Sequence, residues 1–228
     1  MDTLPVDPRK LLAEFIGTYA LIFAGAGSII VSAGTVQGSN LVPIALANGL
    51  AIGLMFIALG HISGGHFNPA VTIGFWVTRR IETILGVAYV LAQLAGAIVA
   101  AIALATLFPD AQANLVNLGT PALGPETGVI QGIVIEAILT AFLVTLYFGS
   151  AVAVVSPKLA GLGIGLVISM DILAAGPLTG AAMNPARAFG PALVDQSWDD
   201  HLVWWIGPII GAVVAALVFH YLFLDEES

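Results

Sequence analysis

The sequence predicts an all-α membrane protein with six transmembrane helices plus two re-entrant half-helices, arranged as an inverted repeat. Three observations support this prediction: long apolar runs without charge, two copies of an Asn-Pro-Ala triplet, and a likeness between the two halves of the chain. The first defines the spans, the second defines the half-helices, and the third indicates their symmetry.

The composition is that of a membrane protein. Apolar residues make up 59% of the 228 residues and charged residues only 9%. No Asp, Glu, Lys or Arg occurs between Glu14 and Arg79, or between Thr83 and Pro109. A helix that crosses a bilayer needs about 20 consecutive apolar residues. The first apolar run is also too long for a cleaved signal peptide. We therefore expect a chain that crosses the membrane several times.

Six spans are expected, three on each side of a long central loop. Their approximate limits are Arg9 to Gly34, Val42 to Gly60, Ile81 to Leu107, Gly128 to Val152, Leu159 to Ala175 and Leu202 to Leu224. The loop between the third and fourth spans, Phe108 to Thr127, is rich in Pro, Asn and Gly. The two halves, about 9–107 and 128–224, therefore have the same layout.

The two triplets predict the half-helices. They are Asn68-Pro69-Ala70 and Asn184-Pro185-Ala186, and glycines precede each of them. Asn is a good N-cap and Pro is favoured at the first helical position, so each triplet predicts a helix start. The apolar pieces that follow, about 69–77 and 185–193, are too short to cross a hydrocarbon core of about 30 Å. Each is expected to be re-entrant.

The halves also share a local pattern at their first spans. Glu14 and Thr18 stand four residues apart in the first half, as Glu136 and Thr140 do in the second. Three spans per half is an odd number, so the halves must cross the membrane in opposite directions. With both termini cytoplasmic, the basic residues outside the second triplet fall on the cytoplasmic side: Arg9, Lys10, Arg79, Arg80 and Lys158.

The chemistry expected where the half-helices meet is that of a passage. Two helix N-termini bring partial positive charge of about half a unit each to one point. Asn68 and Asn184 can cap their helices and still offer N–H donors. Arg187, directly after the second triplet, adds a full positive charge at membrane depth. A side chain that snorkels to the interface is the alternative for Arg187.

Four further residues are expected to brace the re-entrant loops. Glu14 and Glu136 can accept hydrogen bonds from loop N–H groups that otherwise lack partners in lipid. His61 and His66 flank a Gly-Gly pair and are interpreted as bracing the first loop, with pH sensing as the alternative. Asp171 is placed near the outer end of the fifth span, as a cap or brace rather than a proton relay.

Several classes of site are excluded. The chain has no cysteine, which rules out disulfides, thiolate metal sites and cysteine nucleophiles. Its four histidines are not spaced as metal ligands, and no catalytic triad or carboxylate pair is recognisable. We expect no enzyme activity, no metal, no cofactor and no nucleic acid partner.

With its six spans, two half-helices and two Asn-Pro-Ala triplets, the second followed by Arg187, the whole chain resembles the major intrinsic protein (aquaporin) family. The resemblance implies a single membrane channel domain over 1–228 and a homotetramer with one pore per subunit. It implies passage of water or small uncharged solutes, and exclusion of protons and ions.

The resemblance also implies four positions that line the narrowest part of the pore. One is Arg187, and ungapped counting from the triplets places the others at Asn48, Ile172 and Ala181. Strict water channels have an aromatic residue and a His at the positions of Asn48 and Ile172, so this constriction is expected to be wider. Ile172 and Ala181 are most similar to the ammonia- and peroxide-permeable branch, which includes the aquaporin-eight type and plant tonoplast channels. Asn48 departs from the His of that branch.

Glycerol facilitators differ from this chain at three places. They carry Asp where this chain has Ala188 and a basic residue where it has Ala192, and they lack the pair Trp204-Trp205. We therefore expect a passive channel for water that also admits small neutral solutes: ammonia, hydrogen peroxide and, as further candidates, urea or glycerol. The expected location is the cell membrane, as a multi-pass protein.

Three alternatives remain open at this point. A glycerol-type facilitator would have the same fold. An ion- or proton-coupled secondary transporter would need a titrating acid at the midplane, and no acid lies close in sequence to either triplet. A structural junction protein would transport nothing.

Overall fold

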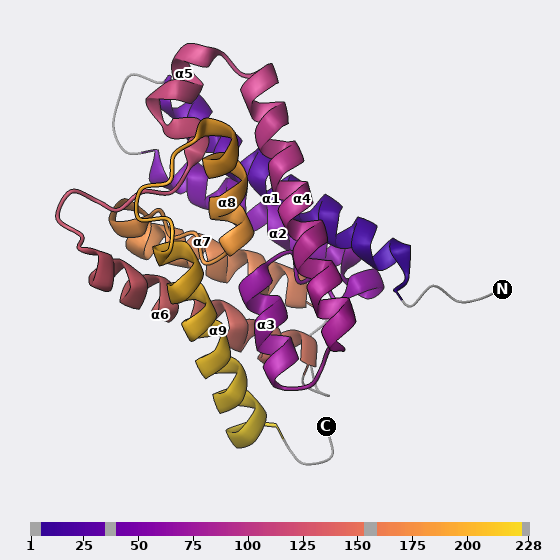
Figure 1. The fold of residues 1–228 in the computed structure, drawn as a ribbon. Helices are drawn as coiled ribbons and strands as arrows, with labels where there is room; N and C mark the ends of the chain where they lie inside the picture. Colours follow the sequence, from indigo (N-terminus) through magenta and orange to yellow (C-terminus); the bar gives the residue numbers. More distant parts are fainter. Residues whose placement is uncertain (1–5, 35–39, 153–158, 225–228) are drawn as a thin grey trace.

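The computed structural model describes residues 6–34, 40–152 and 159–224. Within them the chain is helical, with no strand (Figure 1). The elements in order are α1 (Pro8–Ala33), α2 (Leu41–Ser63), α3 (Pro69–Val77), α4 (Thr83–Leu107), α5 (Asp110–Leu115), η1 (Asn117–Gly119), α6 (Val129–Tyr147), η2 (Phe148–Val152), α7 (Ala160–Thr179), α8 (Pro185–Asp195) and α9 (Val203–Leu222).

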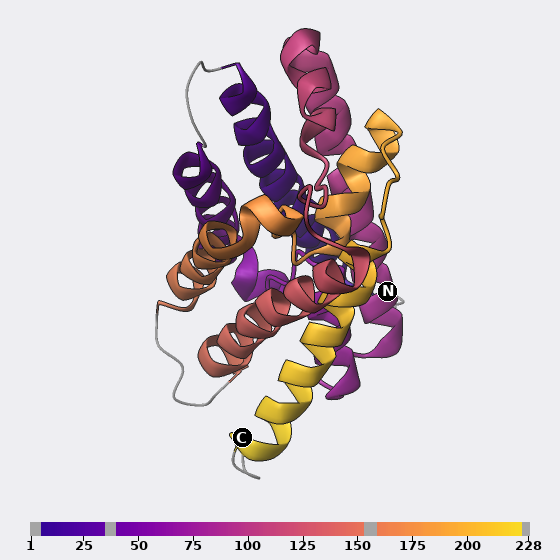
Figure 2. The same cartoon turned by 90° about the vertical axis from the view of Figure 1, so that its left-hand side faces the viewer.

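Six of these helices are long and apolar enough to cross a membrane, and they confirm the six predicted spans. They are α1, α2, α4, α6 (continued by η2), α7 and α9. The two short helices α3 and α8 lie between the long ones (Figures 1 and 2), and each begins at the proline of a triplet. The predicted long loop contains the short helix α5 and the turn η1. Lys158 and residues 35–39, which connect the first two predicted spans, fall outside the described residues.

Two spans extend further than the sequence indicated. The helix α2 ends at Ser63 instead of Gly60, and α7 ends at Thr179 instead of Ala175. Both end where a glycine takes a left-handed conformation, Gly64 with φ of 91° and Gly180 with φ of 76°. Such a residue stops a helix, whereas a helical glycine only weakens it. The longer α7 moves Asp171 from the predicted helix end to the middle of the helix.

The half-helices begin as their sequence predicts. Asn68 Oδ1 accepts a hydrogen bond from the backbone N–H of Ala70 at 2.8 Å, and a proline occupies the first turn. Asn184 Oδ1 accepts from the backbone N–H groups of Ala186 at 3.0 Å and Arg187 at 3.3 Å. Each Asn therefore satisfies backbone donors that would otherwise lack a partner.

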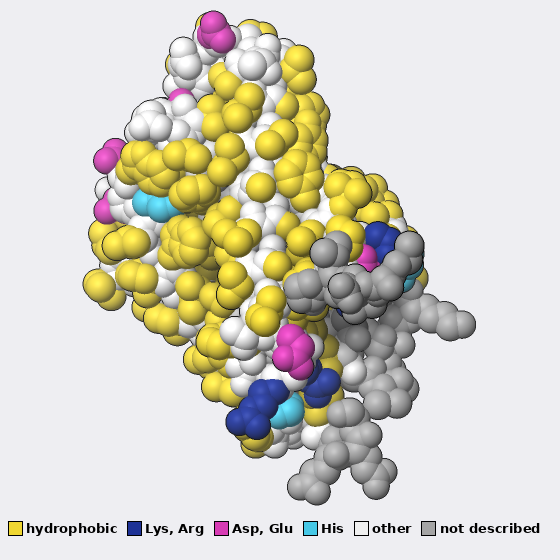
Figure 3. All heavy atoms as spheres, turned by 45° about the vertical axis from the view of Figure 1, so that its right-hand side comes forward, with side chains coloured by type: hydrophobic (Ala, Val, Ile, Leu, Met, Phe, Trp, Pro, Cys, Tyr) yellow, Lys and Arg dark blue, Asp and Glu magenta, His cyan; other side chains and the backbone are white. Residues whose placement is uncertain are grey.

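The long helices pack in pairs through small residues. The principal neighbours are α6 with α9, α2 with α7, and α1 with α4. A methyl group added at Gly211 would collide with the backbone of Ala137, and one at Gly49 would collide with the backbone of Gly165. Such glycines allow membrane helices to approach closely. The outward faces are apolar, as expected for contact with lipid (Figure 3).

Candidate functional site

The two half-helices meet by their asparagines, and each asparagine bonds to the opposite loop. Asn68 Nδ2 donates to the carbonyl of Met183 at 2.8 Å, and Asn184 Nδ2 donates to the carbonyl of Phe67 at 3.0 Å. A side-chain amide has two N–H donors. Because one donor of each amide is used in these cross-links, the second is available to a molecule that passes between the helices.

Glu14 holds the loop before the first triplet. Its carboxylate accepts from the backbone N–H groups of His66 at 3.0 Å and Phe67 at 2.6 Å. It also accepts from Ser63 Oγ at 2.6 Å and Gln93 Nε2 at 2.8 Å. The side chain is fully buried, so each of these bonds satisfies a group that has no access to water.

Glu136 holds the second loop in the same way. It accepts from the backbone N–H groups of Ala182 at 3.0 Å and Met183 at 2.7 Å, and from Thr179 Oγ1 at 2.7 Å. It too is fully buried. The two glutamates thus make the contacts expected of loop braces. Glu14 lies 52 positions from His66 in the sequence, and Glu136 lies 46 positions from Ala182.

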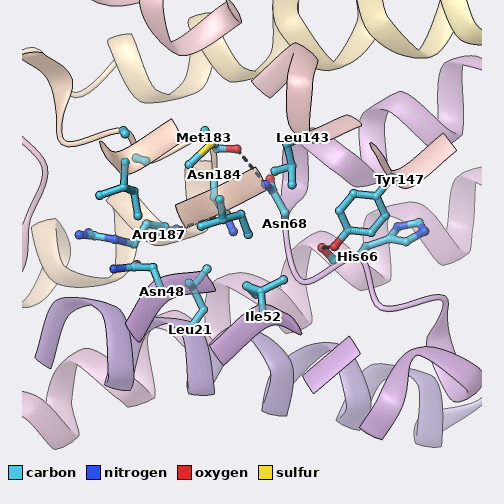
Figure 4. Close-up of a pocket in the computed structure, with 14 residues that line it drawn as sticks. Leu21, Asn48, Ile52, His66, Asn68, Leu143, Tyr147, Met183, Asn184 and Arg187 are labelled. Atoms are coloured by element: carbon cyan, nitrogen blue, oxygen red, sulfur yellow. Dashed lines mark hydrogen bonds between the residues drawn. The ribbon is translucent and has the colours of Figure 1, made fainter. Parts of the chain in front are cut away.

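A narrow cavity runs past both asparagines (Figure 4). Its volume open to the centres of water molecules is about 20 Å³. About 10–15 Å³ on this measure is enough for one water, so the cavity has room for about one water molecule. Arg187 and Asn48 lie at one end in Figure 4, and His66 and Tyr147 at the other.

The four positions implied for the constriction all line this cavity. They are Asn48, Ile172, Ala181 and Arg187. Asn48 donates through Nδ2 to the carbonyl of Ile44 at 2.8 Å, so one of its two donors is used within its own helix. The cavity is polar where Asn48 and Arg187 lie and apolar where Ile172 and Ala181 lie.

Arg187 is buried and held from a distant loop. Its Nη1 donates to the carbonyl of Gly119 at 2.8 Å. Among the described residues it forms no ion pair with an acid. A guanidinium has five N–H donors, so its charge and most of its donors are left for the cavity. The sequence contains no signal for Gly119, which lies 68 positions away and belongs to no motif.

The two predicted bracing histidines differ in the structure. His66 is buried, and its Nδ1 lies 3.1 Å from Thr72 Oγ1. Thr72 in turn accepts from Gln93 Nε2 at 3.0 Å. His61 is exposed on α2, and its side chain makes no hydrogen bond within the described part of the chain, so we find no contact through which it could brace the loop.

Asp171 corrects the sequence prediction. The predicted cap or brace is wrong, because Asp171 lies in the middle of α7, is fully buried, and has no hydrogen-bond partner for either carboxylate oxygen among the described residues. The sequence prediction also missed several residues that bind the loops, among them two that bind helix ends. Tyr89 donates to the carbonyl of Ser63 at 2.7 Å, and Trp204 donates to that of Thr179 at 2.9 Å. They secure the ends of α2 and α7.

A helical membrane protein with two opposed half-helices around a narrow internal cavity has the architecture of a channel. The family model described as Major intrinsic protein matches residues 4–219. The chain is 42% identical to "Aquaporin TIP4-4" of Zea mays, over 96% of this chain and 88% of the relative. It is 39% identical to "Aquaporin TIP2-1" of Arabidopsis thaliana, over 96% and 89%.

The chain belongs to the major intrinsic protein family, and its relatives support the tonoplast-type branch. The fold is similar to that in the "X-ray structure of the aquaglyceroporin from Plasmodium falciparum", with a TM-score of 0.82 and 24% identity over 94% of this chain and 96% of that chain. Members of the family are channels that transport water, so the chain is a multi-pass membrane channel and not an enzyme.

Proposed function

We propose that this chain is a passive channel for water that also conducts ammonia and hydrogen peroxide and excludes protons and ions. The observation that carries the proposal is the single narrow cavity that Asn68, Asn184 and Arg187 share with Asn48, Ile172 and Ala181. We assign these six residues to the pore, with Pro69, Ala70, Pro185 and Ala186 completing the triplets. Glu14, Glu136 and His66 hold the loops.

The size of the cavity favours the smallest solutes. A volume of about 20 Å³ open to water centres accommodates one water at a time. Ammonia and hydrogen peroxide are close to water in cross-section, whereas urea and glycerol require the walls to move apart. Ile172 and Ala181 make one wall unable to hydrogen-bond, which costs least for a solute with few polar groups.

Exclusion of cations follows from the charges around the cavity. The half-helix N-termini contribute partial positive charge, and Arg187 contributes a full charge. Aquaporin-type selectivity is understood in general as the joint effect of pore diameter, lining donors and such electrostatic barriers. The two asparagine amides donate to the oxygen of a passing water, which orients that water at the meeting point.

A coupled transporter is disfavoured by the state of the acids. The carboxylates of Glu14 and Glu136 accept hydrogen bonds from the re-entrant loops and from neighbouring helix side chains. Asp171 is buried within the bundle and does not line the cavity. No acid is therefore placed to take up and release an ion from the cavity within the described residues.

The test is a permeability series on proteoliposomes by stopped-flow light scattering. Water, ammonia and hydrogen peroxide should cross fastest, urea and glycerol at least about tenfold more slowly, and no flux should depend on an imposed ion gradient. Equal glycerol and water permeability would support the glycerol-type facilitator instead. A flux that requires a sodium or proton gradient would support the transporter, and no swelling at all would support the structural junction protein.

We further propose that 1–228 is one channel domain made of two repeats, about 9–107 and 128–224, and that four copies assemble with one pore each. Both termini are placed in the cytoplasm, because the turn with Arg79 and Arg80 then lies inside. The proposed location is the cell membrane. Light scattering of the purified protein tests the tetramer, and membrane fractionation tests the location.

A further inference from the structure

A second hollow lies on the outside of the molecule, between α3 and α4. It has a volume of about 300 Å³ and is lined mainly by Ile73 and Trp76 from α3 and by Gly86, Val87, Val90 and Leu91 from α4. It shares no residue with the pore cavity. We call it the α3–α4 groove.

Gly86 adds no side chain to the wall of the groove and leaves room for one. A Cβ at this position would meet only the methyl groups of Ile81 and Thr72, each at 3.8 Å, which is ordinary van der Waals contact. Val87 and Leu91 are 57% and 62% exposed, so the groove opens outward along a membrane span. A space with such walls gives water almost no hydrogen-bond partners and stays dry. Hydrocarbon from the bilayer fits it.

One end of the groove is polar. Trp76 Nε1 donates to Thr83 Oγ1 at 2.9 Å and joins the two helices there. Tryptophan is typical of the membrane–water interface. The turn between α3 and α4 follows directly, and it carries Arg79 and Arg80. The groove therefore runs from the interface, beside two cations, toward the membrane interior.

These cations have no acidic partner among the described residues. Arg79 is exposed and Arg80 partly buried, and neither forms an ion pair in the described ranges. Arg80 Nε is buried and has no hydrogen-bond partner in the same part of the chain. Basic side chains gather at the lower end of the surface in Figure 3, below a broad hydrophobic face.

The described charges near this end of the groove are positive on balance. A polar hollow beside the groove, which shares Thr83 with it, is lined by Asp7, Lys10 and Glu82. Asp7 forms an ion pair with Arg9 at 2.8 Å, and this hydrogen-bonded guanidinium lowers the pKa of the Asp7 carboxyl. The charges of Asp7 and Arg9 therefore cancel each other. Among the described residues at this end, the remaining charges are three cations, Lys10, Arg79 and Arg80, and one acid, Glu82. Their net charge of about +2 attracts a phosphate.

We propose that the α3–α4 groove binds one acyl chain of an anionic phospholipid, whose phosphate is held by Arg79 and Arg80. The apolar groove and the unpaired arginines complement the two parts of such a lipid. Neither feature is used by the proposed pore, so this site is independent of the solute that the channel conducts. By the positive-inside rule, the lipid belongs to the cytoplasmic leaflet.

The first experiment measures thermal unfolding of the full chain in detergent with added dioleoyl phosphatidylglycerol or dioleoyl phosphatidylcholine. These lipids share their acyl chains and differ in head-group charge. A ligand that binds the folded state raises the Tm, and we expect phosphatidylglycerol to raise it by about 4 °C more than phosphatidylcholine does. The double variant Arg79→Gln, Arg80→Gln should lose this difference.

A groove variant separates the acyl-chain site from simple charge attraction. Gly86→Leu should fill the groove and remove most of the phosphatidylglycerol shift, although both arginines remain. Gly163→Leu is the matched control, because Gly163 lies on α7, where a Cβ would meet only Leu146 at 3.5 Å. This control should keep the full shift.

A second measurement needs no groove variant. Phosphatidylglycerol with brominated acyl chains should quench the fluorescence of Trp76 more strongly than brominated phosphatidylcholine at equal mole fraction, with Trp76→Phe as the reference. The proposal is overturned by equal quenching from the two lipids. It is also overturned by a phosphatidylglycerol shift that survives Gly86→Leu, which would indicate surface charge alone. A change of oligomeric mass on Gly86→Leu would assign the groove to a second copy of the chain and would overturn it too.

Discussion

The two halves of this channel use the same device to hold their re-entrant loops. Glu14 and Glu136 each accept from two consecutive loop N–H groups and from one hydroxyl, that of Ser63 or Thr179. Both halves face the same physical problem, since a non-helical loop at membrane depth must satisfy its backbone donors without water. A buried carboxylate that accepts from the loop N–H groups meets this requirement in both halves.

The halves differ in the side chains that come after the triplets. Four residues after Asn68 stands Thr72, which links Gln93 and His66 through its hydroxyl. The matching position after Asn184 is Ala188, and the residue before it is Arg187, held by Gly119. The first half therefore adds a neutral hydrogen-bond network, and the second adds a cation. We propose that the repeat supplies the scaffold and that selectivity comes from the side chains at which the repeats differ.

The largest expected effect is loss of a loop brace. Glu136→Gln keeps the shape of the side chain but replaces an acceptor oxygen by an N–H donor, which leaves a buried backbone N–H unpaired. We expect a loss of about 3 kcal/mol in the free energy of unfolding, measured in detergent by thermal or denaturant titration. A loss below about 0.5 kcal/mol would contradict the bracing role.

Glu14→Gln sharpens the comparison, because Gln93 Oε1 is buried and has no partner among the described residues. The side-chain amide of Gln93 can rotate by about 180°, and its oxygen can then accept a hydrogen bond from the new N–H donor at position 14. Glu14→Gln should therefore cost roughly half as much as Glu136→Gln. The double variant Glu14→Gln, Gln93→Leu removes this compensating hydrogen bond. It should lose as much free energy of unfolding as Glu136→Gln does.

An effect between those of Glu136→Gln and Glu14→Gln is expected in the loop that holds Arg187. Gly119 has φ of 75°, and a Cβ there would lie 2.8 Å from the Cβ of Ala26. Gly119→Val should thus displace the loop and cost about 2 kcal/mol of stability. It should also increase cation leak, since Arg187 loses its carbonyl partner. Gly128→Ala is the control, because its φ is −75° and its Cβ would meet nothing within 4 Å. Equal stability of the two variants would show that the loop adapts.

Arg187→Val tests the difference between the halves directly, because it makes the second triplet Asn-Pro-Ala-Val, like the first. Removal of a full positive charge from a buried passage should raise proton or cation leak about tenfold, equivalent to about 1.4 kcal/mol of barrier. Proteoliposomes with a pH-sensitive dye measure this leak. A leak no larger than that of the parent would remove the barrier role from Arg187.

A smaller change is expected at the apolar wall. Ile172→His together with Ala181→Phe narrows the cavity and adds a hydrogen-bond donor. The flux of peroxide and urea should therefore fall several-fold relative to the flux of water, which corresponds to about 1 kcal/mol of barrier height. Ala181 has φ of 45°, so the larger residue also incurs some backbone strain. The permeability series is the measurement. Unchanged relative flux would show that the constriction lies elsewhere.

The smallest expected effect is an increase in the free energy of unfolding. Asp171 is a buried acid without a partner in the described residues, and such a group disfavours the folded state. Asp171→Asn keeps its size without the ionisable group and should raise the free energy of unfolding by about 1 kcal/mol. Ser169→Ala on the same helix is the comparison, because it removes a hydroxyl that donates to the carbonyl of Ala45 at 3.0 Å and should lower stability. A loss of stability in Asp171→Asn would indicate that the carboxylate has a binding role.

Much of the fold could be predicted because its signals are local. A charge-free apolar run defines a span, and Asn68-Pro69 or Asn184-Pro185 starts a half-helix through atoms within three residues of each other. Helix ends were predicted less well. Whether Gly60 or Gly64 stops α2 depends on which of them takes a left-handed conformation, and the residue type alone does not show this.

The sequence by itself determined the spans, the half-helices and the family, because charge, hydropathy and the triplets act over short distances along the chain. Only the tertiary structure decided the partners: Gly119 for Arg187, the loop N–H groups for the two glutamates, none for His61 or Asp171 within the described residues. These contacts join positions 46 to 68 residues apart. They depend on which helix faces pack together, and a single sequence does not specify such pairings residue by residue.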